Sequence, residues 1–182
     1  MNPALVLVDI QKDYFPNGRM ELVGAAEAGK AAKKLLDHFR EKNLPVVHIQ
    51  HISTRPGATF FLPGTEGINF HESIAPLSDE LVIKKNFPNS FRATPLQEQL
   101  TSRGIKALVI CGMMSHMCID TTVRAAFDKE YQCMVAHDAC ATRTLVFHGV
   151  EIPANYVHGA YMAALGAVFA KVLSEEEIIA TL

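Results

Sequence analysis

The chain has 182 residues, of which 49% are apolar, so it can bury the core of one domain without disulfides or a structural metal. Its formal net charge is -2 and its charged residues are interspersed, which excludes the basic block that a nucleic-acid partner needs. No apolar stretch approaches a membrane span of roughly 20 residues, and the apolar run 4–8 is too short for an export signal. We therefore expect a cytoplasmic protein whose partner is a small-molecule substrate, not nucleic acid or a membrane.

Six short runs rich in β-branched residues alternate with helical patterns along the chain. The runs cover residues 4–8, 45–50, 81–84, 107–111, 132–137 and 167–173. Continuous apolar strands of this kind are typical of a parallel sheet that is buried on both faces. The sequence therefore predicts an α/β fold in which residues 1–182 form a single domain, with a doubly wound, mostly parallel six-stranded sheet flanked by helices.

The predicted helices have recognisable ends. Residues 24–42 are rich in Ala, Lys and Leu and are followed by Asn43 and Pro45, which suit a helix terminus. Thr94 and Pro95 are placed to begin a second helix that closes near Gly104. Ser174 is followed three residues later by Glu177, a spacing that predicts a capping box before the C-terminal helix.

Residues 52–78 show neither helical nor strand periodicity. This segment contains three glycines and several aromatic residues, among them Phe60 and Phe61. Long irregular segments in compact domains often serve as lids or binding loops. We expect a substrate-covering loop here, with a dimer contact as the alternative.

Reactive side chains fall at the ends of three predicted strands. Asp9 follows the first strand, Lys84 or Lys85 ends the third, and Cys118 follows the fourth after a glycine turn. In doubly wound sheets, ligands bind beyond the carboxyl ends of the strands. We expect these side chains to converge there, although each type alone is more often a cap, a solvated cation or a packing residue.

Cys118 lies near the start of a predicted helix. If Ser115 is the N-cap, Cys118 occupies the first turn, where free amides and the helix dipole favour an anion and lower the pKa of a thiol. The same amides could hold the oxyanion of an attacked carbonyl, and Asp9 could accept the thiol proton. Cys118 is therefore the candidate nucleophile. Cys111 and Cys133 lie within apolar runs and are expected to be packing residues.

Other residue clusters suggest competing chemistries. His116, two residues before Cys118, would suggest a Cys and His catalytic pair of the papain kind. Residues two apart on a helix point in different directions, so this pair is not favoured. His48 and His51 could bind zinc, but no carboxylate accompanies them in the sequence. A rival cluster after the fifth strand is formed by His137, Asp138 and Cys140. We expect Asp138 to cap or brace the site and Cys140 to be inert. Neither GxGxxG nor GxxxxGK[ST] occurs, so no nucleotide cofactor is expected.

Three ordered segments resemble the isochorismatase-like cysteine hydrolase superfamily, which includes nicotinamidases and N-carbamoylsarcosine amidase. VLVDIQKDYF resembles its aspartate motif, KNFPNSFRATPLQEQL its lysine motif and ALVICGMMSHMCIDTTVRAAFDK its cysteine motif. The likeness runs nearly end to end. It implies that Lys85, six residues before Phe91, is the catalytic lysine. It also implies a cis peptide between Met113 and Met114, an oxyanion hole formed by the amides of Met114 and Cys118, and a homodimer or homotetramer.

Two departures restrict what the resemblance implies. Nicotinamidases carry a metal-binding Asp and His motif after the second strand, whereas this chain reads HIQHIS, so no metal is expected. Isochorismatases proper cleave a vinyl ether and lack the cysteine, which is present here as Cys118. These differences favour amide, ureide or carbamoyl chemistry.

The sequence thus predicts a hydrolase that cleaves a C–N bond of a small molecule through a thioester on Cys118, assisted by Asp9 and Lys85. Vinyl ether, ester or nitrile hydrolysis, a non-catalytic small-molecule binder and a structural oligomer are the alternatives. The expected substrate-binding residues are Gln11, Phe15, Phe60, Phe61 and Tyr156.

Overall fold

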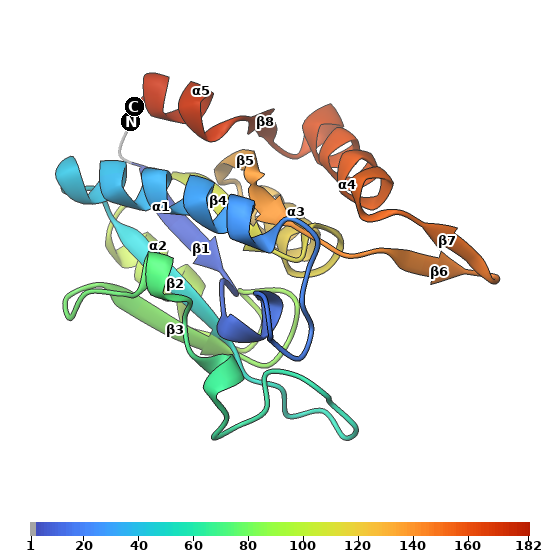
Figure 1. Cartoon of the computed structure of the whole chain (residues 1–182). Coiled ribbons are helices and arrows are strands. Elements are labelled where there is room, and N and C mark those ends of the chain that lie inside the picture. Colours follow the sequence, from blue (N-terminus) through green and yellow to red (C-terminus); the bar gives the residue numbers. More distant parts are fainter. Residues whose placement is uncertain (1–2) are drawn as a thin grey trace.

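The computed structural model describes residues 3–182 and contains a six-stranded parallel sheet in the order β3-β2-β1-β4-β5-β8 (Figure 1). The strands are β1 (Pro3–Val8), β2 (Val46–His51), β3 (Leu81–Lys85), β4 (Ala107–Met113), β5 (Gln132–Ala141) and β8 (Lys171–Leu173). β1 and β4 are buried along their whole length, as their continuous apolar sequences predict. The predicted doubly wound α/β fold is confirmed.

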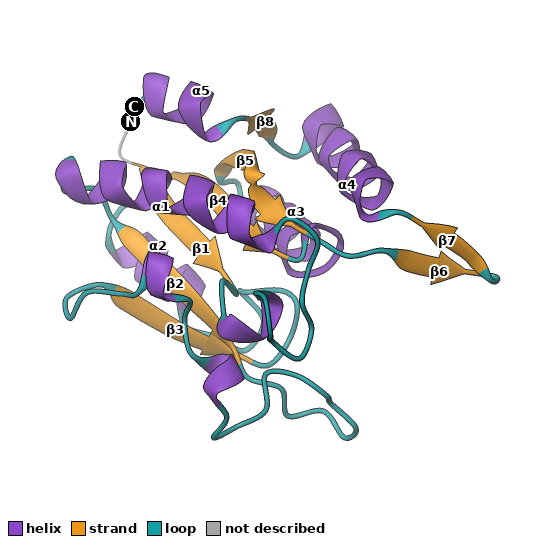
Figure 2. Cartoon of the chain, viewed as in Figure 1, coloured by secondary structure: helices purple, strands orange, loops and turns teal. Residues whose placement is uncertain are grey.

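Helices cover both faces of this sheet (Figure 2). They are α1 (Ala25–Glu41), α2 (Leu96–Ser102), α3 (Asp120–Asp128), α4 (Ala154–Val168) and α5 (Glu175–Ala180). α1 packs across β1, β2, β4 and β5 with α5 beside it, while α2 and α3 lie on the opposite face (Figure 1). α1 buries Ala28, Ala32, Leu35 and Phe39, whose spacing of three and four residues forms one apolar stripe.

Two predicted element boundaries were wrong. The last strand begins at Lys171 instead of residue 167, because α4 continues to Val168 through a stretch rich in Ala and Leu, which are strong helix formers. The N-cap of α2 is Pro95 rather than Thr94. The Thr94 hydroxyl donates to the Ser90 carbonyl at 2.6 Å and accepts from the Leu96 amide at 3.4 Å. The capping box of Ser174 and Glu177 is confirmed.

β5 is longer than its predicted range of 132–137. Its register against β4 shifts between Ile110 and Gly112, and the strand continues to Ala141. His137, Asp138 and Cys140 therefore lie within a strand and do not follow it. Asp138 Oδ1 accepts a hydrogen bond from the Glu175 amide at 2.8 Å, so it braces the start of α5 and not the site.

The segment 52–78 is anchored by buried polar side chains. Gln11 donates to the carbonyls of His51 and Ile68, at 2.9 Å each, and accepts from the His51 amide at 2.7 Å. Asp13 accepts from the Phe61 amide at 2.6 Å. Two short 3-10 turns, 66–68 and 72–74, interrupt the segment. These bonds fix the loop to the chain that follows β1, beside the carboxyl edge of the sheet.

A short antiparallel hairpin, β6 (Leu145–Phe147) and β7 (Val150–Ile152), projects from the body of the molecule between β5 and α4 (Figure 2). The sequence reasoning did not predict it. Across residues 3–182, none of the helices has the length and apolar character that crossing a membrane requires.

Candidate active site

Three strands deliver Asp9, Lys85 and Cys118 to the carboxyl edge of the sheet. Asp9 follows β1, Lys85 is the last residue of β3, and Cys118 lies in the turn after β4. All three side chains are buried. Cys118 Sγ lies within 4.8 Å of an Asp9 carboxylate oxygen, and Lys85 Nζ lies 2.7 Å from Asp9 Oδ2. The structure therefore brings together three residues that are far apart in the chain.

The ends of β1 and β4 approach each other closely beside these residues. Gly112 has a φ of +127°, and a Cβ at this position would collide with the carbonyl of Val8. Asp9 itself has a φ of +53°, a left-handed conformation that aspartate tolerates better than most residues. The backbone around the site thus depends on residue types that accept positive φ.

Asp9 and Lys85 form a fully buried ion pair. Lys85 Nζ also lies 3.2 Å from each of the Phe87 and Pro88 carbonyl oxygens and from His51 Nδ1, so its three protons are shared among four acceptors. Burial disfavours the ammonium, but Asp9 and Cys118 outweigh it and the pKa of Lys85 is raised. Asp9 Oδ1 is buried without a hydrogen-bond partner in the described part of the chain. That free acceptor can take a proton.

Cys118 occupies a single π-helical turn, Ser115–Ile119, that runs directly into α3. The N-cap of this turn is Met114, so the expectation that Ser115 is the N-cap was wrong. The cause is the wide turn itself, in which the Met114 carbonyl accepts from the amides of Met117 and Ile119, at 3.0 and 3.2 Å. The peptide bond between Met113 and Met114 is cis.

The electrostatic surroundings of Cys118 differ from the sequence expectation. Burial and the Asp9 carboxylate raise the pKa of the Cys118 thiol, and the opposing effect of Lys85 does not reverse the shift. The predicted lowering of the Cys118 pKa was therefore wrong. The place of Cys118 near the start of a helix could be inferred from the sequence, whereas its burial could not. The resting thiol is neutral, so a nucleophilic thiolate requires a base such as Asp9.

A cavity of about 330 Å³ opens onto Cys118. This volume suits a small organic molecule. Its wall combines aromatic, amide, hydroxyl and sulfur-bearing side chains with one guanidinium. The lining residues are Tyr14, His51, Ser53, Thr54, Arg55, Phe60, Asn86, Phe87, Pro88, Met114, Met117 and Cys118. Four of them, Ser53, Thr54, Arg55 and Phe60, come from the segment 52–78.

His51 belongs to the site, although sequence reasoning considered it only as a zinc ligand. Its Nδ1 lies 3.2 Å from Lys85 Nζ and 3.8 Å from Asp9 Oδ2. Burial, together with Lys85 and Arg55, lowers the pKa of His51 despite the opposing effect of Asp9. His51 is therefore neutral near pH 7. The sequence feature that could have predicted this role is the place of His51 at the carboxyl end of β2, the strand next to β1.

Metal-type donors of Asp9, His51 and Cys118 lie within 4.8 Å of one another. The Lys85 ammonium, however, contacts both Asp9 Oδ2 and His51 Nδ1, at 2.7 and 3.2 Å. A fixed positive charge thus lies where a cation would bind, and the Cys118 thiol is neutral. The donor set fits a protonated lysine and does not fit a metal ion.

The predicted substrate-binding residues are scattered. Phe60 lines the cavity. Phe61 is buried behind it and packs on Tyr14, while the amide of Gln11 is committed to the loop anchor. Phe15 stacks on His71, with ring centroids 3.7 Å apart, outside the cavity. Tyr156 is 68% exposed on α4 and also lies outside the cavity wall. Only Phe60 is thus placed to contact a ligand beside Cys118.

The other candidate histidines are engaged elsewhere. His116 Nδ1 lies 2.6 Å from Thr142 Oγ1. His48 Nε2 lies 2.8 Å from Glu80 Oε2. His48 and His51 are three residues apart in β2 and point to opposite faces of the sheet, so they do not form a common ligand set. Cys140 is buried within β5.

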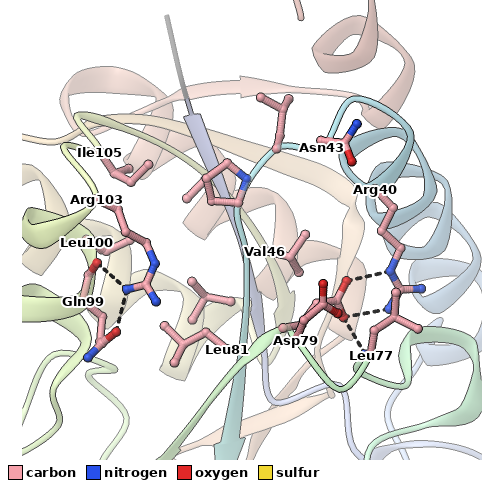
Figure 3. A pocket seen from close by; sticks show the side chains of 15 residues that line it. Arg40, Asn43, Val46, Leu77, Asp79, Leu81, Gln99, Leu100, Arg103 and Ile105 are labelled. Carbon is pink, nitrogen blue, oxygen red and sulfur yellow. Dashed lines mark hydrogen bonds and ion pairs between the residues drawn. The ribbon is translucent and has the colours of Figure 1, made fainter.

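A second cavity of about 330 Å³ lies at the amino edge of the sheet (Figure 3). Arg40 donates to Glu80 at 2.7 Å in its wall. Arg103 is bonded to Gln99 on the other side of the cavity from Arg40 (Figure 3). Its lining contains neither a cysteine nor a serine. The cavity beside Cys118 is therefore the candidate active site.

Comparison with known proteins shows which family shares this fold and these motifs. The isochorismatase domain model matches residues 3–177. The isochorismatase family protein YddQ of Bacillus subtilis, which is uncharacterized, is 51% identical over 98% of this chain and 99% of its own length. Nicotinamidase 3 of Arabidopsis thaliana is 41% identical over 76% of this chain and 73% of its own. A crystal structure from Oleispira antarctica, assigned to the isochorismatase hydrolases, superposes with a TM-score of 0.94 at 48% identity and covers 98% of this chain and 96% of its own.

Proposed function

The chain belongs to the isochorismatase family of hydrolases, and on that premise we propose that it cleaves a C–N bond of a small amide, ureide or carbamoyl compound. The observation that carries the proposal is the buried cluster in which Cys118 lies within 4.8 Å of an Asp9 carboxylate oxygen. One oxygen of that carboxylate, Oδ1, has no hydrogen-bond partner in the described residues. Nicotinamidase 3, whose name states an amide substrate, is similar to this chain.

In the proposed reaction Asp9 removes the proton of the Cys118 thiol, and the thiolate attacks the carbonyl carbon of the substrate. Lys85 remains protonated and holds Asp9 Oδ2, which leaves Oδ1 free for the proton. The tetrahedral intermediate collapses when Asp9 returns the proton to the departing nitrogen. An amine or ammonia leaves and a Cys118 thioester remains, which water then hydrolyses with Asp9 as base.

The negative oxygen of the tetrahedral intermediate needs hydrogen-bond donors. We assign this role to the backbone amides of Met114 and Cys118, both of which line the cavity. The Met114 amide donates to no protein acceptor in residues 3–182, so it is free to bind a ligand oxygen. The neutral resting thiol supports the use of Asp9 as a base instead of a preformed thiolate.

The test is release of ammonia from a panel of small amides, ureides and carbamoyl compounds, measured on the native protein and on Cys118→Ala. Cys133→Ala is the matched control, because it removes another buried thiol that lies outside the cavity beside Cys118. We expect release that persists in Cys133→Ala and disappears in Cys118→Ala. Undiminished release by Cys118→Ala would remove the thiol from the reaction, and hydrolysis of esters, nitriles or vinyl ethers alone would replace the C–N assignment.

We also propose that the chain assembles as a homodimer or homotetramer through the β6–β7 hairpin. Val146, Phe147 and Val150 on this hairpin are 65%, 66% and 65% exposed. An isolated two-stranded hairpin is marginally stable in water, and exposed apolar patches often mark interfaces. Light scattering of the native protein and Phe147→Ser tests this, since a smaller particle in the variant supports the contact and an unchanged mass contradicts it.

A further inference from the structure

The cavity beside Cys118 has an unbalanced charge. Arg55 is the one residue with a full charge among the described residues that line it, and no Asp or Glu is part of the wall. Asp9 lies behind the wall, and its negative charge is matched by Lys85 at 2.7 Å. A ligand in this cavity therefore meets a net positive field, which favours a negatively charged group and disfavours a cationic one.

The tautomer of His51 adds a hydrogen-bond donor to the same cavity. A lysine ammonium only donates, so His51 Nδ1, at 3.2 Å from Lys85 Nζ, must be the acceptor. A neutral imidazole with an unprotonated Nδ1 carries its proton on Nε2. His51 lines the cavity, and Nε2 has no hydrogen-bond partner within residues 3–182. His51 therefore presents an N–H to a ligand and cannot act as a base through this nitrogen.

We propose that Arg55 and His51 form a subsite for a carboxylate of the substrate, next to the C–N bond that faces Cys118. This inference rests on the proposed function and narrows its substrate class to small amides or ureides that bear a carboxylate. The guanidinium matches a carboxylate in charge and geometry, and the imidazole N–H donates to one of its oxygens. Phe60 and Phe87 supply apolar walls for a short carbon chain between the two reactive ends.

Two alkylating probes test the subsite without a known substrate. Iodoacetate and iodoacetamide have nearly the same shape and differ in charge. Each reacts by forming a carbon–sulfur bond to Cys118 as iodide leaves and the thiol proton is released. The quantity to measure is the ratio of the second-order rate constants, iodoacetate over iodoacetamide, with mass spectrometry to locate the label on Cys118. Because both probes attack the same thiol, the ratio cancels any change in thiol reactivity.

We expect Arg55→Gln to lower this ratio by about 2- to 5-fold, the effect of losing one exposed ion pair. His51→Leu should lower it as well, even if its contact with Lys85 changes both rates. Arg103→Gln is the control of equal charge change, since Arg103 lies at the amino edge of the sheet and is bonded to Gln99. Its ratio should equal that of the native protein.

An unchanged ratio in Arg55→Gln would overturn the proposal, and so would an equal fall in Arg55→Gln and Arg103→Gln, because that result reports overall charge only. The alkylation ratio and the ammonia assay test different claims, so each can fail without the other. The ammonia assay can fail while the ratio still depends on Arg55, in which case the carboxylate subsite stands and the C–N chemistry does not.

Discussion

The two edges of the sheet each hold an ion pair beside a cavity of about 330 Å³, partly buried at the amino edge and fully buried at the carboxyl edge. The pairs differ in how completely their hydrogen-bonding groups are satisfied. At the amino edge, Glu80 accepts from Nε and Nη2 of Arg40 and from the Leu77 amide, and its carboxylate also contacts His48. At the carboxyl edge, Asp9 Oδ1 has no partner within the described residues and a thiol lies nearby. A charge pair beside a cavity therefore does not identify an active site by itself. A carboxylate oxygen without a partner, next to a nucleophile, is the feature that identifies one.

The ion pair at the amino edge contributes to stability, whereas the ion pair at the carboxyl edge belongs to the candidate active site. Glu80 links α1 to the segment before β3 and to β2 through hydrogen bonds that engage both of its carboxylate oxygens. Asp9 and Lys85 are held in a pocket where both side chains are 0% exposed, at the cost of desolvating two charges. We expect changes at the amino edge to affect stability alone, and changes at the carboxyl edge to affect stability and activity together.

The largest effect is expected for Lys85→Met, which leaves the Asp9 carboxylate buried without its cation. Breaking one partner of a buried pair costs about 3 to 5 kcal/mol of unfolding free energy, and activity should be lost as well. Lys84→Met is the matched control, because the Lys84 side chain is exposed on the other face of the same strand. Urea unfolding and the ammonia assay measure the two effects.

The double variant Asp9→Asn/Lys85→Met separates these effects, because asparagine tolerates the left-handed backbone of position 9. Removal of both charges should restore much of the lost stability, since no charge remains to be desolvated. Activity should remain absent because the proposed base is gone. Recovered activity in the double variant would show that Asp9 is not required for the reaction.

A smaller effect is expected for Glu80→Gln at the amino edge. The substitution keeps the shape but weakens the hydrogen bonds from Arg40, so we expect a loss of about 2 kcal/mol of unfolding free energy. The kcat and KM for any substrate of the native protein should stay within about twofold, since Glu80 lines the cavity at the amino edge and not the cavity beside Cys118. A large fall in kcat would show that the two edges are coupled.

The pH dependence of that stability difference provides a further test. Burial opposes ionisation, but hydrogen bonds from Arg40, Leu77 and His48 lower the pKa of Glu80 to about 2. The folded pKa thus lies below the unfolded value, so the stabilisation is complete above about pH 4.5 and declines as the pH falls toward about 2. We expect a contribution of about 1 to 2 kcal/mol after solvent screening. The difference in unfolding free energy between native protein and Glu80→Gln should shrink over that acidic range, and a constant difference would contradict the assigned shift.

The sequence could predict the fold and the convergence of three side chains because parallel strands place their carboxyl ends together. Strand reasoning left Lys84 and Lys85 as alternatives, since LVI was interpreted as a strand buried on both faces. In the structure β3 alternates, with Ile83 and Lys85 inward and Val82 and Lys84 outward. The pattern of an edge strand therefore selects Lys85, in agreement with the family resemblance.

Other features of the site depend on tertiary structure that local patterns do not encode. The raised pKa of Cys118 follows from burial by segments remote in sequence, and the role of His51 follows from its contact with Lys85. Loop geometry decides which aromatic residues reach the cavity. Phe60 reaches it, whereas the adjacent Phe61 packs on Tyr14 behind it.

The smallest effect is expected for Tyr156→Ala, at a residue that belongs to neither edge. Its ring is 68% exposed on α4 and outside the wall of the cavity beside Cys118, so little packing is lost and no ligand contact is removed. Surface changes of this kind usually alter the unfolding free energy by less than about 0.5 kcal/mol. Phe60→Ala is the matched comparison, because it removes an aromatic ring from the cavity wall. We expect a raised KM for Phe60→Ala and an unchanged KM for Tyr156→Ala in the ammonia assay. A raised KM for Tyr156→Ala would mean that α4 reaches a substrate site, either by movement within one chain or by contact with the site of a second copy.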